Sequence, residues 1–152
     1  MPQSIPSPPP ATHSNVKLIA TLSLLSPDKV AYVTFLTAPD AQAGWFLPND
    51  LLRNGENPYA AAKRIAHAQL GVEPKEVQLV DVDSFTGNDG TWHIAFHFRA
   101  EAKDPKAVKG GAEIARLEWM PLGALPEKLK VAHGGWFNGI ATRAHRHRQA
   151  SK

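Results

Sequence analysis

The chain has 152 residues, 43% hydrophobic and 20% charged, a balance typical of a single soluble globular domain. No apolar run approaches the ~20 residues of a membrane helix, and the absence of Cys excludes disulfides and thiolate metal sites. Four of the 17 Lys and Arg residues lie in the acid-free segment 143–152, so the rest of the chain is about neutral although the net charge is +3. These features argue against membrane and nucleic-acid-binding proteins, and we expect a cytoplasmic location.

The N-terminal segment differs in composition from the rest of the chain. Residues 1–15 contain five prolines together with Ser and Gln, which predicts a disordered arm. This segment has neither a basic start nor an apolar core, so we expect no secretory signal. A domain is predicted at 16–148, followed by a basic tail end at 149–152.

The first half of the domain predicts three strands. Apolar and polar residues alternate at 18–24, which indicates a half-buried strand, and a β-branched and aromatic stretch follows at 30–37. These two strands are predicted to pair as a hairpin. Trp45 to Leu47 should form a short third strand that Pro48 stops, before a long loop at 49–57.

A helix is predicted from Pro58 to Leu70. Asn57 is a favourable N-cap, Pro58 suits the first helical position, and Gly71 ends the helix. Two apolar stripes run along the helix, so we expect it to be covered on more than one side. One stripe is Tyr59, Ala62, Ala66 and Leu70, and the other is Ala61, Ile65 and Ala68.

Two further strands, at 76–85 and 91–102, flank a strong turn and are predicted to run antiparallel. Asp81 and Asp83 share one face of the first strand, either as a relocated carboxylate pair or as a solvated or loop-bonding strand end. On the second strand, one face is expected to enter the core and the other is a candidate surface for substrate binding. The core face carries Trp92, Ile94, Phe96 and Phe98, and the candidate face carries His93, His97 and Arg99.

A strand at 113–120 and a helix at about 136–148 complete the predicted domain. The helix should bury Trp136, Phe137, Ile140 and Ala144. Its basic end, which begins at Arg143, has the charge density of a phosphate-contacting patch. Cations at a helix C-terminus are also favoured by the helix dipole, so we predict a solvated helix end. Together the elements predict an α/β fold in which helices flank a mixed sheet.

The segment 45–72 resembles the Nudix box, whose pattern is Gly-x5-Glu-x7-Arg-Glu-U-x-Glu-Glu-x-Gly-U with U a bulky aliphatic residue. Every gap is kept, with Glu56 and Arg64 in register and Asp50 in place of the first Gly. The segment 116–122, Arg-Leu-Glu-Trp-Met-Pro-Leu, is also similar to that family. The resemblance covers nearly the whole domain and implies the Nudix fold, a mixed β-sheet sandwiched between α-helices.

The acidic positions of this box are lost. Ile65, Ala68 and Gln69 stand where the family pattern has Glu. Residues at these spacings share one face of a helix, where three carboxylates could hold Mg²⁺. An isoleucine, an alanine and a neutral amide cannot do so. No cofactor is therefore expected, and Mg or Mn would be needed if the protein were active.

Two charged residues of the box pattern are retained, the acidic Glu56 and the basic Arg64. The resemblance implies that the Arg orients the loop and helix through a carboxylate and that the Glu lies near the metal. We predict that their contact is structural rather than catalytic. If a metal site persists, its candidate ligands are Asp50, Glu56 and Glu113.

Two functions are consistent with these residues. The first is a catalytically degenerate Nudix domain kept for ligand binding, regulation or interaction, with a nucleotide-like small molecule, a protein or a second copy in a homodimer as partner. The second is an atypical Nudix hydrolase that cleaves the diphosphate linkage of a nucleoside diphosphate derivative with Mg or Mn. Metal-dependent release of phosphate products distinguishes them.

Overall fold

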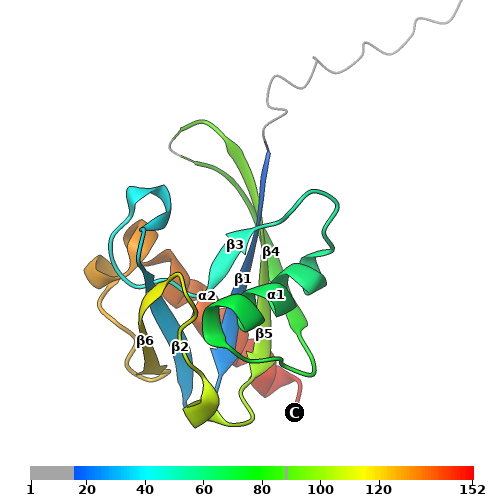
Figure 1. Ribbon diagram of the computed structural model, residues 1–152, viewed down its shortest axis with the longest axis vertical. Coiled ribbons are helices and arrows are strands. Elements are labelled where there is room, and N and C mark those ends of the chain that lie inside the picture. Colours follow the sequence, from blue (N-terminus) through cyan, green and yellow to red (C-terminus); the bar gives the residue numbers. More distant parts are fainter. Residues whose placement is uncertain (1–15, 88) are drawn as a thin grey trace, which may run out of the picture.

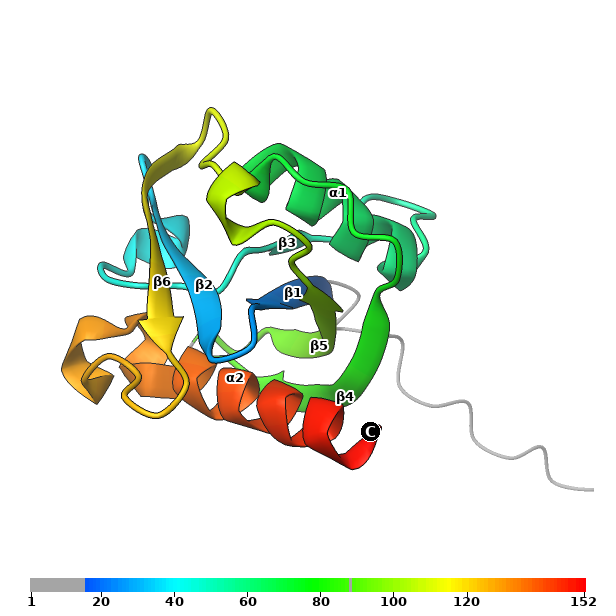
Figure 2. The ribbon, with the colours of Figure 1, turned by 90° about the horizontal axis from the view of Figure 1, so that it is seen from below.

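The computed structural model describes residues 16–87 and 89–152, so the predicted disordered arm at 1–15 lies outside the described residues. Within them, strands form one mixed sheet, and helices α1 (Pro58–Leu70) and α2 (Ala132–Ala150) lie on its two sides, as Figure 1 and Figure 2 show. The predicted α/β architecture is confirmed. The strands are β1 (Lys17–Leu25), β2 (Lys29–Phe35), β3 (Asn49–Leu51), β4 (Gln78–Thr86), β5 (Trp92–Glu101) and β6 (Ile114–Pro121).

The sheet has the order β4-β5-β1-β2-β6, and β3 pairs with β1. β1 runs parallel to β5 along its whole length, whereas β2 runs antiparallel to β6. The predicted hairpin of β1 and β2 is registered only at Leu25 and Val30, because the strands then diverge and the chain around β3 lies between them. This divergence leaves room for a groove at the open end of the sheet.

The short strand predicted before Pro48 is not formed as a regular strand. Trp45 and Phe46 make only isolated bridges, to Val131 and Val33, and the regular strand β3 follows Pro48. We predicted that Pro48 would stop the strand, and this was wrong because a proline lacks only the amide donor and keeps its carbonyl acceptor. Its carbonyl still accepts a hydrogen bond from the Leu22 amide at 2.9 Å, so the chain continues alongside β1.

Helix α1 begins and ends where the sequence predicts. The Asn57 side chain accepts a hydrogen bond from the Tyr59 amide at 2.8 Å, and Gly71 ends the helix with a left-handed φ of 66°. Both apolar stripes are mostly buried, but each has an exception. Tyr59 is 46% exposed and lies edge-on to Phe98, and Ala68 is also exposed.

The two faces of β5 do not divide as predicted. Phe98 is buried as expected, but Trp92 is 40% exposed near the β4–β5 turn. On the opposite face His97 and Arg99 are buried, because α2 covers that side of the sheet. A strand covered on both faces gives no reliable alternation signal, since neither face is open to water.

Helix α2 has an irregular start and a buried end. Its first turn has left-handed φ values at His133, Gly134 and Gly135, so the regular helix begins near the predicted Trp136. Phe137, Ile140 and Ala144 are buried as predicted, and Trp136 is half-buried. No helix in the described part of the chain is long and apolar enough to cross a membrane.

The C-terminal end of α2 was predicted to be solvated, and this prediction was wrong for Arg148. Arg148 is only 5% exposed and donates hydrogen bonds to the Ser26 carbonyl at 2.8 Å and the Pro27 carbonyl at 3.0 Å. It also pairs with Glu101 at 2.9 Å. The basic segment therefore fastens α2 to the β1–β2 turn, a role that charge density alone does not reveal.

Candidate functional site

Arg64 on α1 is the centre of a charged cluster. Its Nε and Nη2 atoms donate to the two carboxylate oxygens of Glu56 at 2.8 and 2.9 Å. Its Nη1 donates to Asp50 at 2.8 Å, and Nη2 also donates to the Leu51 carbonyl at 3.1 Å. The predicted contact between Glu56 and Arg64 is present. Since one guanidinium holds the loop, β3 and α1 together, the cluster fixes the shape of the box.

The same contacts fix the charge state of Glu56. The Arg64 guanidinium, with a further hydrogen bond from the Arg53 amide, lowers the pKa of Glu56 to about 2. The carboxylates in turn raise the pKa of Arg64. Glu56 is therefore an anion at neutral pH, and both of its oxygens are already occupied by donors.

Gln69 stands at a position where the family pattern has Glu, and its side chain is hydrogen-bonded to β3. Its side chain is buried, and its Nε2 donates to the Asn49 carbonyl at 2.7 Å while its Oε1 accepts from the Asn49 amide at 3.1 Å. A primary amide can pair with both the N–H and the C=O of one residue, whereas an ionised carboxylate can only accept. The amide at 69 thus has a structural use that Glu would not fulfil.

The other two former acidic positions differ in exposure. Ile65 is 0% exposed within the core, whereas Ala68 is exposed. The chain before β6 lies against the end of α1, where the Gly111 amide donates to the Gln69 carbonyl at 3.0 Å. A Cβ at Gly111 would lie 1.8 Å from the Ala68 carbonyl oxygen, so this close approach requires glycine. The three positions lie on one side of the regular helix α1, as predicted, but only Ala68 among them is exposed.

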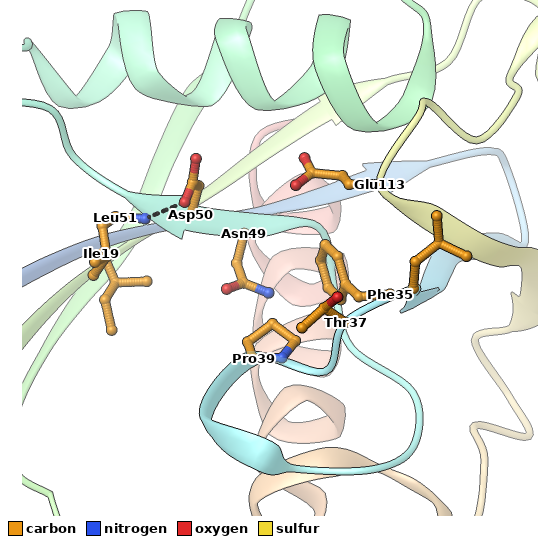
Figure 3. A pocket seen from close by; sticks show the side chains of 9 residues that line it. Ile19, Phe35, Thr37, Pro39, Asn49, Asp50, Leu51 and Glu113 are labelled. Carbon is orange, nitrogen blue, oxygen red and sulfur yellow. Dashed lines mark hydrogen bonds between the residues drawn. The ribbon is translucent and has the colours of Figure 1, made fainter.

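A hollow of about 510 Å³ lies beside β3, and Figure 3 shows its lining. Asp50 and Glu113 are its acidic residues. In Figure 3 the Asp50 carboxylate is turned toward α1, and the Glu113 carboxylate points from the opposite wall toward Asp50. The remaining lining residues, mostly apolar, are Ile19, Phe35, Leu36, Thr37, Pro39, Asn49 and Leu51. We call this space the β3 hollow.

The three predicted substrate-binding residues of β5 differ in how accessible their side chains are. His93 lines a second space, of about 840 Å³, near the start of α2. His97 is 0% exposed, and its ring nitrogens lie 2.7 Å from the Thr21 hydroxyl and 2.8 Å from Asp83. Arg99 is 6% exposed and donates to His147 and Gln78. Of the three, only His93 lines either hollow.

Asp81 and Asp83 share a partner that sequence reasoning missed. Arg143 on α2 donates to Asp81 at 2.6 Å and to Asp83 at 3.2 Å. The acidic pair is therefore neither a solvated strand end nor a free set of metal ligands. Trp136, Phe85 and Arg143 line the second space, and their only sequence signal was the aromatic and basic content of two separate elements.

The protein-family model of the NUDIX domain matches residues 21–138 of this chain. The chain belongs to the Nudix family. No curated protein matches it.

Solved structures share the fold at low identity. The MutT NUDIX hydrolase from Burkholderia pseudomallei has 18% identity and a TM-score of 0.67, over 84% of this chain and 97% of that chain. The MutT/nudix family protein from Enterococcus faecalis has 16% identity and a TM-score of 0.72, over 99% of this chain and 66% of that chain. The NUDIX domain of Shewanella oneidensis NrtR has 16% identity and a TM-score of 0.68, over 86% and 87% of the two chains.

The residues of this Nudix box fit a divalent metal ion poorly. Nudix hydrolases generally use Mg or Mn, and the candidate ligands here are Asp50, Glu56 and Glu113. Two of them, Asp50 and Glu56, are each held at 2.8 Å by the Arg64 guanidinium, a cation that would repel a second cation. The described residues contain no group of three or more His, Cys, Asp and Glu side chains arranged to hold a metal.

Proposed function

We propose that this Nudix domain binds a small ligand in the groove beside β3 and does not hydrolyse it. The observation that carries the proposal is the use made of the former metal positions on α1. Ile65 packs in the core, and the Gln69 amide pairs with the backbone N–H and C=O of Asn49. These side chains replace metal chemistry with packing and hydrogen bonds.

The charged cluster supports the same proposal. A metal ion bound between Asp50 and Glu56 would have to displace the Arg64 guanidinium, which makes charge-assisted hydrogen bonds to both. Loss of a catalytic metal removes both water activation and charge stabilisation at the phosphate. The retained cluster instead keeps the loop and helix in shape for binding.

A relative gives a precedent for ligand binding. The NUDIX domain of Shewanella oneidensis NrtR was crystallised with ADP ribose. We use ADP ribose as one probe for this chain because the fold is shared. The β3 hollow and the second space offer concave surfaces of the size that small ligands occupy, which favours a ligand-binding domain over one used only for protein contacts.

One observation favours a second candidate, an atypical Nudix hydrolase. Asp50 and Glu113 lie on opposite walls of the β3 hollow, and their carboxylates could hold Mg²⁺ or Mn²⁺ with water completing the coordination. A solved structure of similar fold, at 14% identity, is an Ap4A hydrolase from C. elegans. A dinucleoside polyphosphate is therefore a suitable test substrate.

The test is hydrolysis of ADP ribose, a nucleoside triphosphate and a dinucleoside polyphosphate with Mg²⁺ or Mn²⁺. We expect turnover several orders of magnitude below that of a Nudix hydrolase with an intact box. Metal-dependent cleavage that Glu113→Gln abolishes would establish the atypical enzyme. Glu113 is exposed, so this variant should fold normally, whereas Glu56→Gln also weakens the Arg64 cluster.

A further inference from the structure

The second space, which we call the α2 hollow, is lined by residues of the β4–β5 end of the sheet and of the start of α2. Its volume is about 840 Å³, larger than the 510 Å³ of the β3 hollow. Ile19 lines both hollows, and the adjacent residues Pro39 and Asp40 line one each. The two hollows are therefore neighbouring parts of one groove.

Aromatic rings form much of the wall of the α2 hollow. Phe85 and His93 are stacked with centroids 5.1 Å apart and an angle of 7° between their planes. Trp136 stands edge-on to Phe85 at 5.4 Å, and His133 stands edge-on to Trp136 at 6.3 Å. Parallel and perpendicular ring faces around one space suit a flat ligand that stacks on one ring and meets the edge of another.

Asp83 provides a fixed hydrogen-bond acceptor in this wall. Burial lowers the pKa of His97, so its ring is neutral at pH 7. Since Asp83 can only accept, His97 Nε2 must carry the proton, and Nδ1 accepts from the Thr21 hydroxyl. His97 and Arg143 both donate to Asp83 Oδ2, and no donor to Oδ1 is recorded among the described residues. Oδ1 is thus available to accept from a ligand.

The charges of the groove disfavour an anionic ligand. Asp40, Asp83 and Asp89 line the α2 hollow, where the only cation among the described lining residues is Arg143. That guanidinium is already shared between Asp81 and Asp83. The β3 hollow adds Asp50 and Glu113 and no cation from the described chain. Asp50 is paired with Arg64 at 2.8 Å, and Asp89 lies 3.9 Å from Lys17, so part of this charge is compensated. The lining carboxylates still outnumber their Lys and Arg partners, so a phosphate group would meet a net negative charge, whereas N–H donors and positive charge would be stabilised.

We propose that the α2 hollow binds a planar nitrogen heterocycle that carries no phosphate, stacked on one of its aromatic rings and donating an N–H group to Asp83. This inference rests on the proposed ligand-binding function and specifies its ligand class. Trp136, Phe85 and His93 provide the stacking surface. Asp83 selects rings with a donor, and the remaining carboxylates select against phosphorylated forms of the same ring.

The experiment is titration calorimetry of the full chain in EDTA with two matched series: adenosine, AMP and ADP, and guanosine, GMP and GDP. We expect a nucleoside to bind most tightly and each added phosphate to weaken binding by roughly five- to tenfold. The penalty should shrink at high salt, because screening weakens repulsion between partly exposed charges. This ranking needs no variant and so does not depend on the folding of one.

A matched pair of variants tests the cause. Asp40→Asn removes one groove charge at a position with a left-handed φ of 54°, which Asn also tolerates. It should reduce the phosphate penalty, whereas Asp28→Asn on the exposed β1–β2 turn should leave it unchanged. Asp83→Asn should weaken nucleoside binding about tenfold by replacing the ionised acceptor.

The outcomes separate the ligand class from the function. The proposal is overturned if ADP or GDP binds as tightly as its nucleoside in EDTA, or if no member of either series binds. Tighter binding of the phosphorylated forms without cleavage would reject only the ligand class. Metal-dependent cleavage that Glu113→Gln abolishes would instead reject the proposed function, whatever the ranking in EDTA.

Discussion

The α1 and α2 sides of the groove use polar side chains in opposite ways. On the α1 side Arg64 donates to both carboxylate oxygens of Glu56, and Gln69 pairs with both the backbone N–H and the backbone C=O of Asn49. On the α2 side His97 and Arg143 hold one oxygen of Asp83, whose side chain stays 36% exposed. In the first, closed arrangement the polar groups bond to one another and hold the loop, β3 and α1 in place. The second holds an acceptor in place and leaves its other oxygen without a protein donor among the described residues.

The largest effect is expected from restoring a family acid at a buried position. Ile65→Glu, studied in EDTA, would place an unpaired carboxylate in the core and should destabilise the protein by about 4 kcal/mol or more. Ala68→Glu at the exposed position should change the unfolding free energy by only about 0.5 kcal/mol. Urea denaturation measures both. Equal stability of the two variants would show that the α1 side is not closed.

A smaller loss is expected for Gln69→Glu. The ionised side chain would oppose the Asn49 carbonyl with an oxygen in place of a donor, at a cost of about 2 kcal/mol at pH 7. Burial should raise the pKa of the new carboxyl, so its protonated form, present at low pH, recovers the donor and the lost stability. Unfolding curves at pH 4 and 7 test this. Gln149→Glu, on the exposed end of α2, is the control and should show little of this pH dependence.

The smallest expected effect concerns pH on the α2 side. Burial lowers the folded-state pKa of His97 below its ordinary value of 6.5. Its neutral form therefore contributes stability that is complete above pH ~6.5 and is lost as the pH falls through the folded pKa. His97→Gln should flatten the dependence of unfolding free energy on pH in that window. His67→Gln, on the exposed face of α1, should not, and a flat wild-type curve would contradict the burial effect.

Much of the fold was predictable because its signals are local. Asn57, Pro58 and Gly71 each act on neighbouring backbone groups, so the ends of α1 follow from the sequence. The exposed position of Trp92 and the burial of His97 were not predictable. Both depend on where α2 and the parallel neighbour β1 lie, which the alternation along β5 cannot encode.

The candidate site was only partly predictable for the same reason. The spacing of the box placed Glu56 and Arg64 in contact, eight residues apart on one loop and helix. The partners of Asp83 come from β5 and from α2, and Arg143 is 60 residues away. No local pattern joins such residues, and the acidic pair on β4 could only be assigned once α2 was packed against it.

The sequence by itself determined the family, the ends of α1 and the loss of three acidic groups from the box, because each is written in residue identity and spacing. Only the tertiary structure decided what the replacement residues do. Whether Gln69 faces solvent or holds a peptide of β3, and whether Asp83 is solvated or buttressed, depends on contacts across the chain. Those contacts form only when the sheet and both helices have packed, since packing sets which donors and acceptors meet.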